Sequence, residues 1–231
     1  SVLFQYVKSP EIDSIMPADG SVKGGTTLTI TGTSLTKYPG ASFRCRFGDN
    51  VVVWAALVTA MDGEAFLRCV APPMSNSRVN VDVSLNGGTD YTSSGLVFNY
   101  HASTRILSIL PTTGPVFGAT VVLVTGSNFY NSASIGCLFG TEKSLFSNFV
   151  NDTAIECTAP SRHTSGEVSI QVTMNGVDYV ALASPNAKYT YSERPYISSV
   201  APTRVMSGGG TTMFVQGGNF HFSLGLSCRF G

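Results

Sequence analysis

The sequence is poor in charge. Of its 231 residues only 12% are charged, with 14 Lys or Arg against 14 Asp or Glu, so the formal net charge is zero. This balance leaves no basic face for nucleic acid or for an anionic membrane, and we expect neither as a partner. No apolar run reaches the roughly 18 residues that a membrane-spanning helix needs, so we expect no direct membrane insertion of this segment.

Signals for catalysis and for cofactors are also scarce. The three histidines, His101, His163 and His221, lie in different parts of the chain and lack a carboxylate or Cys at a useful spacing, which favours surface or linker positions. No Gly-x-Ser-x-Gly motif is present. The Gly-rich stretch SGGGTT at 207–212 lacks the lysine of a phosphate-binding loop. We therefore expect a non-enzymatic protein with no catalytic residue, no cofactor and no metal.

What the sequence has instead is an internal repeat. The phrases FRCRFG, GCLFG and SCRFG end at Gly48, Gly140 and Gly231, which are 92 and 91 residues apart. Four further landmarks keep this register: a proline, a threonine nine residues later, a glycine six residues further on, and a large apolar residue three beyond it. They are Pro17, Thr26, Gly32 and Leu35; Pro111, Thr120, Gly126 and Phe129; and Pro202, Thr211, Gly217 and Phe220. This regularity indicates a tandem array with a period near 91 residues.

The repeat predicts four segments. VLFQY at 2–6 resembles LVFNY at 96–100 and AKYTY at 187–191, which close the two complete units. We therefore interpret residues 1–8 as the last strand of a preceding unit, 9–102 and 103–193 as complete units, and 194–231 as the N-terminal part of another. The linkers are short, and Pro195 stiffens the second, so we expect a rod-like array.

Alternating side chains predict strands. VNVDVSLNG at 79–87 and VSIQVTMNG at 168–176 place apolar residues at every second position, the period of a half-buried strand. Each ends in Asn-Gly, at Asn86-Gly87 and Asn175-Gly176, which predicts type I′ hairpin turns. No segment has a helical period with caps. The sequence thus predicts all-β units, each an antiparallel β-sandwich of about seven strands.

Five cysteines fit the repeat. Each complete unit has two, which predicts the disulfides Cys45–Cys69 and Cys137–Cys157 in an oxidising compartment. Cys228 belongs to the third unit, and we expect its partner beyond residue 231, which leaves it unpaired by truncation. The alternative is that these are buried free thiols of a cytosolic protein.

Two surface features are notable. Asn151-Asp152-Thr153 is an Asn-x-Thr sequon, which makes Asn151 a glycosylation candidate and an N-linked glycan a candidate partner. Trp54 and Phe146 each lie six residues after the repeat glycine, which favours packing within or between domains, with an exposed adhesive patch as the alternative. The stretch from Gly48 to Cys69 is four residues longer than its counterpart, so we expect unit-specific contacts there.

The order of the motifs resembles that of a known family. Ile-x-x-Ile-x-Pro, Pro-x-x-Gly, Gly-Gly-Thr-x-Leu-x-Ile-x-Gly, Cys-x-Phe-Gly and Cys-x-Ala-Pro follow one another in the first unit and, with Ala119 in place of the second Gly, recur in part in the second. This order resembles the IPT/TIG family of immunoglobulin-like domains. The resemblance implies tandem immunoglobulin-like β-sandwiches of the E-set type. In plexins and the hepatocyte growth factor receptor family similar domains with similar Cys pairs form extracellular stalks. In Rel-type transcription factors a single, cysteine-poor copy touches DNA.

Tandem copies with paired cysteines resemble the extracellular branch of the family. We therefore expect an extracellular or cell-surface location and a structural or adhesive role, in a rod, fibre, surface coat or flagellar appendage. The expected partners are other proteins or copies of itself, because a surface of low charge gives little electrostatic repulsion. Two alternatives stay open: the ectodomain stalk of a plexin-like or growth-factor-receptor-like protein, and an accessory module of a carbohydrate-active enzyme.

Overall fold

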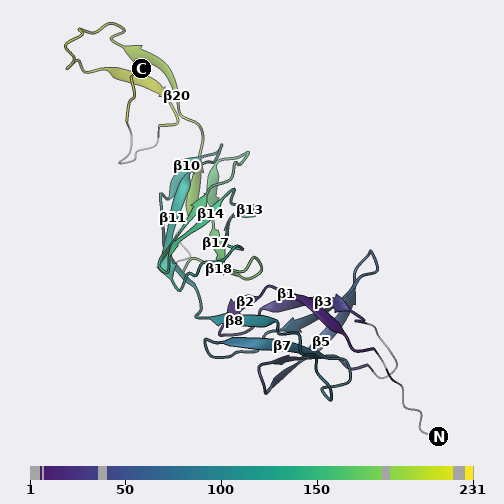
Figure 1. Cartoon of the computed structure of the whole chain (residues 1–231). Helices are drawn as coiled ribbons and strands as arrows, with labels where there is room; N and C mark the ends of the chain where they lie inside the picture. The colour runs from purple at the N-terminus through teal and green to yellow at the C-terminus, as the bar shows by residue number, and fades with distance from the viewer. Residues whose placement is uncertain (1–5, 7, 36–40, 184–187, 221–226, 231) are drawn as a thin grey trace.

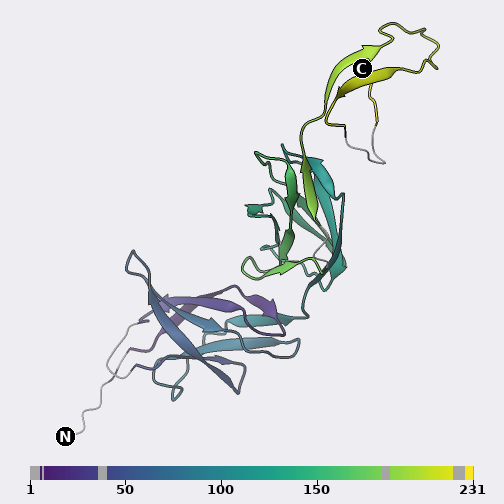
Figure 2. The same cartoon turned by 180° about the vertical axis from the view of Figure 1, so that it is seen from behind.

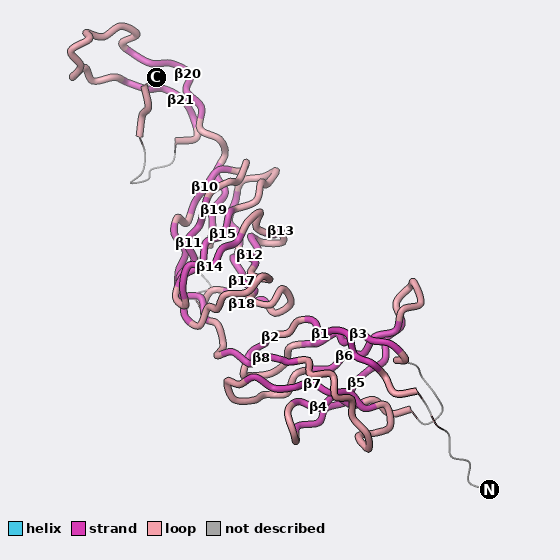
Figure 3. Tube along the Cα trace, viewed as in Figure 1, coloured by secondary structure: helices cyan, strands magenta, loops and turns pink. Residues whose placement is uncertain are grey.

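The chain folds into successive β-sandwiches. A computed structural model describes residues 6, 8–35, 41–183, 188–220 and 227–230, and within these ranges it contains strands and loops but no helix (Figure 3). The predicted all-β, immunoglobulin-like fold class is confirmed. Figure 1 shows the two complete domains one after the other, with the two ends of the chain at opposite ends of the molecule, and Figure 2 shows the same succession from behind.

The first domain is a single sheet folded into two layers. Its strands are β1 (Glu11–Met16), β2 (Asp19–Ser21), β3 (Thr27–Thr33), β4 (Arg44–Phe47), β5 (Val51–Thr59), β6 (Ala65–Val70), β7 (Arg78–Ser84) and β8 (Val97–His101). They pair in the order β1-β3-β6-β5-β4-β7-β8-β2. The first half of β5 pairs with β4 and the second half with β6, so this one strand belongs to both layers.

The second domain has the same plan, but the counterparts of β5 and β7 are each divided into two shorter strands. Its strands are β9 (Arg105–Leu110), β10 (Thr113–Pro115), β11 (Val121–Ser127), β12 (Gly136–Phe139), β13 (Glu142–Lys143), β14 (Ser147–Asn151), β15 (Ala154–Thr158), β16 (Gly166–Val168), β17 (Ile170–Thr173), β18 (Tyr179–Ala181) and β19 (Tyr189–Ser192). The sheets are β14-β15-β11-β9, β13-β12-β17-β18 and β10-β19-β16. The counterpart of β5 is divided between β13 and β14, so its two halves lie in separate sheets.

The four additional residues of the first domain extend this segment. They allow β5 to run without a break for nine residues and to turn back into β6 through Ala60–Glu64. The backbone N–H of Ala60 donates to the carbonyl oxygen of Glu64 at 2.8 Å and closes that turn.

Each domain has its own hydrophobic core. The alternation seen in the sequence places Leu28 and Ile30 of β3, and Val122 and Val124 of β11, completely inside. Three aromatic rings, Phe139, Tyr189 and Tyr191, meet edge to face in the second core, with centroids 5.0–6.5 Å apart. The clusters of the two domains share no residue. Each sandwich therefore has the core of a separate folding unit.

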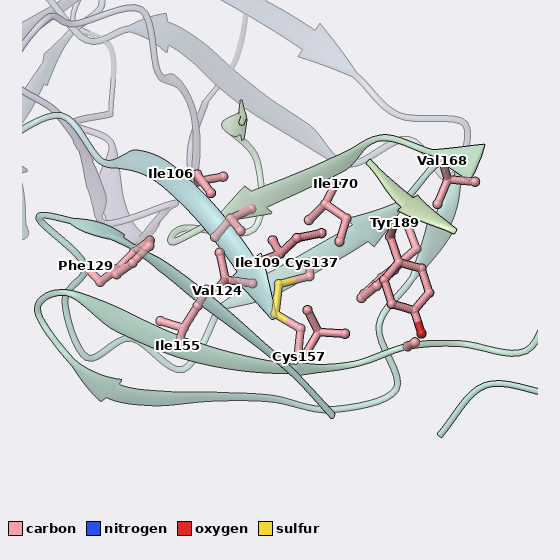
Figure 4. Packing of buried hydrophobic residues seen from close by; sticks show 14 of the residues in the cluster. Ile106, Ile109, Val124, Phe129, Cys137, Ile155, Cys157, Val168, Ile170 and Tyr189 are labelled. Carbon is pink, nitrogen blue, oxygen red and sulfur yellow. A yellow bond between two sulfur atoms is a disulfide. The ribbon is translucent and has the colours of Figure 1, made fainter. Parts of the chain in front are cut away.

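A disulfide crosses each core from one layer to the other. Cys45 on β4 is bonded to Cys69 on β6, and Cys137 on β12 to Cys157 on β15, the same pairs that the sequence predicts. All four residues are buried, and Figure 4 shows the bond between Cys137 and Cys157 among the buried side chains of the second domain. Closing loops of 24 and 20 residues contributes about 3 kcal/mol to each domain through the unfolded chain.

The predicted type I′ turns are wrong. A type I′ turn centred on Asn-Gly needs positive φ at both residues, but neither Asn86 nor Asn175 has it, and positive φ occurs instead at Gly87 and Gly88 in the first domain and at Gly176 in the second. In the second domain β17 and β18 form a hairpin through Met174–Asp178, and in the first the chain returns to β8 only after residues 85–96. The side chain of each Asn, rather than its backbone, organises the loop.

The repeated glycine near the end of β3, and of the corresponding strands in the other units, is explained by close backbone contact. A Cβ on Gly32, Gly126 or Gly217 would overlap the carbonyl oxygen of a residue on the adjacent strand, in the third case Tyr196. The register shifts near this point in all three units. In the third unit the strands concerned are β20 (Tyr196–Ala201) and β21 (Phe214–Gly218), which pair with each other.

Candidate functional site at the joint between the two domains

The first domain contributes a glycine turn and a threonine to the joint. β2 pairs in parallel with β8, which aligns Asp19 with Asn99 and Gly20 with Tyr100. A Cβ on Gly20 would lie 2.5 Å from Oγ1 of Thr26, so the glycine lets the turn close over this side chain. Thr26 is 1% exposed, yet its hydroxyl is directed toward the second domain. Thr26 is a landmark of the repeat, and Gly20 is the glycine of the Pro-x-x-Gly motif.

The second domain contributes the loop between β17 and β18. Asn175 Oδ1 accepts hydrogen bonds from the backbone N–H of Val177 at 3.1 Å and of Asp178 at 2.8 Å. Its amide nitrogen donates to Asp178 Oδ2 at 2.8 Å. Thr173 Oγ1 donates to the same Asn oxygen at 3.2 Å. These bonds hold an amide and a carboxylate side by side at the tip, and we call the pair Asn175 and Asp178 the clasp.

The clasp makes two hydrogen bonds across the joint. Asn175 Nδ2 donates to the backbone carbonyl oxygen of Asp19 at 2.9 Å, and Thr26 Oγ1 donates to Asp178 Oδ2 at 2.6 Å. Asn175 is 7% exposed. Hydrogen bonds to an ionised acceptor are stronger than neutral ones, and burial removes the competing water. Both views in Figures 1 and 2 place this end of the second domain against β2 and β8.

An aromatic stack lies beside the clasp. The ring of His101, at the end of β8, is stacked on Tyr130 with centroids 3.7 Å apart and 11° between the planes. His101 Nε2 lies 2.9 Å from Asp19 Oδ1, which also accepts from Asn99 Nδ2 at 3.1 Å. Burial raises the pKa of the Tyr130 phenol above its usual range, and the nearby carboxylates of Asp19 and Asp178 raise it further.

The linker itself is held from both sides. The hydroxyl oxygens of Ser21 and Ser103 lie 2.9 Å apart, and Asn128 Nδ2 donates to the carbonyl oxygen of Ser103 at 2.9 Å. Asn219, at the same repeat position as Asn128, donates to the carbonyl oxygen of Arg194 at 3.0 Å. Both Asn residues have positive φ, 61° and 59°, which Asn tolerates better than most residues. The same linker contact thus occurs twice.

The contacts described across the joint are mostly polar. Grooves lie beside the clasp, one lined by Lys23, Gly25 and Thr104 and another by Met16, Thr29 and Ala133. Because the two apolar cores do not merge, the relative orientation of the domains depends on these hydrogen bonds and on the ring stack. The arrangement can hold two domains together.

The histidines lie in different surroundings. His101 is the last residue of β8 rather than a linker residue, and the sequence pattern gave no sign of its stack on Tyr130. His163 is exposed. His221 lies outside the described residues. In the part of the chain that the structure describes, no three His, Cys, Asp or Glu residues are grouped so that they could hold a metal ion.

Trp54 corrects a prediction. Packing within a domain, or between the two complete domains, is wrong, because Trp54 is 72% exposed and Phe146 is 77% exposed. The guanidinium of Arg44 lies 2.9 Å from the centroid of the Trp54 ring, an exposed cation–π contact. In the second domain Gly136 occupies the position of Arg44 next to the repeat cysteine, so this surface differs between the two domains.

The remaining predicted residues are on the surface. Cys228 is exposed and has no partner among the described residues. Asn151 is exposed at the turn from β14 to β15, and its Oδ1 accepts from both the backbone N–H and the hydroxyl of Thr153, at 2.9 and 2.8 Å. Within the described ranges no helix has the length and apolar character to span a membrane.

A comparison of the sequence with known protein families shows which family the chain belongs to. The sequence profile described as IPT/TIG domain matches residues 10–100 and again residues 104–191, which together make up most of the chain. The chain belongs to the IPT/TIG domain family. Gly20 and Thr26 therefore lie in the first of two IPT/TIG domains, and Asn175 and Asp178 lie in the second.

Solved structures of similar fold include the plexin A4 extracellular region. One such structure, of domains 1 to 10, has a TM-score of 0.53 and 19% identity over 84% of this chain and 16% of that one. A second, of domains 1 to 8, has a TM-score of 0.46 and 18% identity over 79% of this chain and 18% of that one. This IPT/TIG chain thus spans less than a fifth of the length of these plexin chains, and the likeness is one of fold.

Proposed function

We propose that this chain is part of a non-enzymatic, extracellular array of IPT/TIG domains that holds a fixed spacing and transmits force, in a rod, fibre, surface coat or appendage. One observation carries the proposal: each core is cross-linked between its layers, and the two domains are joined by buried side-chain hydrogen bonds. A cross-link within each unit and a clasp between units are what a mechanical connector needs. Buried disulfides also require an oxidising compartment, which supports the extracellular location.

Labelling of cells tests the location. An antibody against residues 9–193 is applied to intact and to permeabilised cells that produce the protein, and a thiol-reactive mass tag is applied to the same cells before lysis. The proposal predicts equal labelling of intact and permeabilised cells, and no tag on Cys45, Cys69, Cys137 or Cys157. Staining that appears only after permeabilisation, with tagged cysteines, would overturn it.

We propose that Asn151 carries an N-linked glycan. Its exposure at a strand end and the contact between its side chain and Thr153 support this. In native material the peptide containing Asn151 should lose mass on treatment with a glycosidase. Only the unmodified peptide should be found in a Thr153→Ala variant. An unmodified Asn151 in the native protein would contradict the proposed glycosylation.

We also propose that copies of the array associate with one another or with other proteins. The zero formal net charge lowers the electrostatic cost of contact, and exposed apolar side chains such as Trp54 and Val52 on β5 offer contact surface. Sedimentation of the native protein at increasing concentration should show assemblies larger than a monomer. A sedimentation coefficient that stays at the monomer value would contradict self-association.

A second candidate is the stalk of a plexin-like receptor. The fold similarity to the plexin A4 extracellular region favours it, and a stalk would use the same joint for the same mechanical purpose. The full reading frame separates the two candidates, since a receptor needs a membrane-spanning segment and a cytoplasmic domain. An array with neither supports the fibre or coat.

A further inference from the structure

The first domain carries its own copy of the clasp. Asn86 Nδ2 donates to Asp90 Oδ2 at 2.8 Å, the same distance as between Asn175 and Asp178 in the second domain. The backbone N–H of Asp90 donates to Asn86 Oδ1 at 3.0 Å, and Ser84 Oγ donates to that oxygen at 2.9 Å. Thr173 takes the place of Ser84 in the second domain. Three hydrogen bonds are thus reproduced, although the first loop has one more residue between Asn and Asp.

The two clasps occupy the same place in their domains. β7, which precedes Asn86, pairs with the strand that carries Cys45, just as β17 pairs with the strand that carries Cys137. In the second domain the clasp lines a groove together with Thr104, where the chain enters the domain. In the first domain Asn86 and Asp90 line a groove together with residues 8–12, which are the entering segment. Each clasp therefore faces the entry side of its sandwich.

The two clasps differ in whether they are covered. Asn175 is buried against the first domain. Asn86 and Asp90 are exposed, and among the described residues the side-chain nitrogen Nδ2 of Asn86 donates to Asp90 alone. The loop of the first domain therefore exposes a side-chain N–H of Asn86 and a carboxylate oxygen of Asp90. In the second domain the equivalent groups of Asn175 and Asp178 bind the carbonyl oxygen of Asp19 and the hydroxyl of Thr26.

We propose that Asn86 and Asp90 form half of a second joint, whose other half is an IPT/TIG domain on the entry side. That domain presents a turn like Asp19–Gly20, whose carbonyl accepts from Asn86, and a buried threonine like Thr26, whose hydroxyl donates to Asp90. The inference rests on the proposed function and extends it, because one clasp per domain would set the same spacing along the whole array. The proposal also gives the threonine of the Gly-Gly-Thr motif a role, because its hydroxyl donates a hydrogen bond to the domain that follows.

An extended chain tests the proposal. A second copy of residues 9–102 is fused ahead of residue 9 of the present chain, so that residue 9 follows residue 102 as Ser103 does naturally. The readout is hydrogen exchange of the Asn side-chain amides, followed by NMR. In the 231-residue chain the Asn86 amide should exchange freely and the Asn175 amide slowly. In the extended chain exchange at Asn86 of the original domain should slow by about tenfold or more, as expected for a buried, bonded amide.

Two variants of the added copy supply the controls. Thr26→Val in the added copy alone should return Asn86 of the original domain to fast exchange and leave Asn175 unchanged. Thr33→Val in the added copy, at the opposite end of β3, should change neither. Fast exchange at Asn86 in a folded extended chain with slow exchange at Asn175 would overturn the second joint alone. Fast exchange at both residues would overturn the proposed connector as well.

Discussion

At the scale of residues, adjacent glycines of the repeat serve different purposes. A Cβ on Gly24 would lie 2.6 Å from the backbone nitrogen of Pro73 and 2.7 Å from the carbonyl oxygen of Ala71. Gly25 faces open space with φ of 91°, and Ala119 occupies its position in the second domain with φ of 65°. Only Gly24 is required by contact with the Cys-x-Ala-Pro segment. The sequence marks both glycines but does not separate the two reasons.

This difference predicts unequal costs for two similar substitutions. Gly24→Ala meets backbone atoms and a positive φ of 71°, so it should lower the free energy of unfolding of the first domain by about 3 kcal/mol or more. Gly25→Ala meets only the conformational strain and should cost about 1 kcal/mol. Thermal and denaturant unfolding measure both. Equal losses would show that contact with the Ala-Pro segment is unimportant.

Two tyrosines at the same repeat position also differ. Tyr191 Oη donates to the carbonyl oxygen of Pro160 at 2.9 Å, whereas Tyr100 Oη is buried and has no hydrogen-bond partner within the described ranges of the chain. Tyr191→Phe should therefore cost about 1 kcal/mol of stability, and Tyr100→Phe should be neutral or stabilising. Denaturant unfolding decides the matter, and a larger loss for Tyr100→Phe would contradict this assignment.

The same phenols predict a loss of stability in alkali. Burial raises the pKa of Tyr100, and that of Tyr191, to about 12, whereas a phenol in the unfolded chain has a pKa of about 10. Because the unfolded chain releases these protons first, their contribution to stability is complete below about pH 10 and is lost as the pH rises toward 12. Unfolding free energies between pH 8 and 11 should fall less steeply for Tyr100→Phe. Parallel curves would be inconsistent with a raised pKa of Tyr100.

At the scale of elements, alternation was sufficient to find the principal strands. Leu28 and Ile30 are in the core as their period-two spacing predicts. The pattern did not reveal that β5 crosses between the layers, because that depends on which strand lies beside each half, and local alternation does not report it. For the same reason Trp54 was assigned to packing although its side of the strand faces solvent.

The disulfides predict how each domain responds to force. Cys45 and Cys69 are 24 positions apart in the sequence, and the bond between them removes this stretch from the length gained when the first domain unfolds under tension. At about 3.4 Å per residue, reduction should lengthen that unfolding step by about 80 Å, and the step of the second domain by somewhat less. Single-molecule pulling with and without reductant measures the difference. Steps of equal length in both conditions would mean that the cysteines do not cross-link the domains that unfold.

At the scale of the whole molecule, the sequence supplied the parts of the joint but not their contact. Thr26 was visible as a repeat landmark and Asn175 as a turn residue. Their contacts join segments about 150 positions apart, and only the relative placement of two folded domains brings these segments together. The Asn-Gly signal was read as backbone geometry, although the function of Asn175 lies in its side-chain amide.

The central claim is that the clasp fixes the orientation of one domain relative to the next. The most direct test is the distribution of distances between spin labels at Asp62→Cys and Lys143→Cys, two exposed positions, in the 231-residue chain with Cys228→Ser. One narrow distribution is expected; it should broaden in Thr26→Val and stay narrow in Thr33→Val. A broad distribution in the parent chain, or one that Thr26→Val leaves unchanged, would contradict the account.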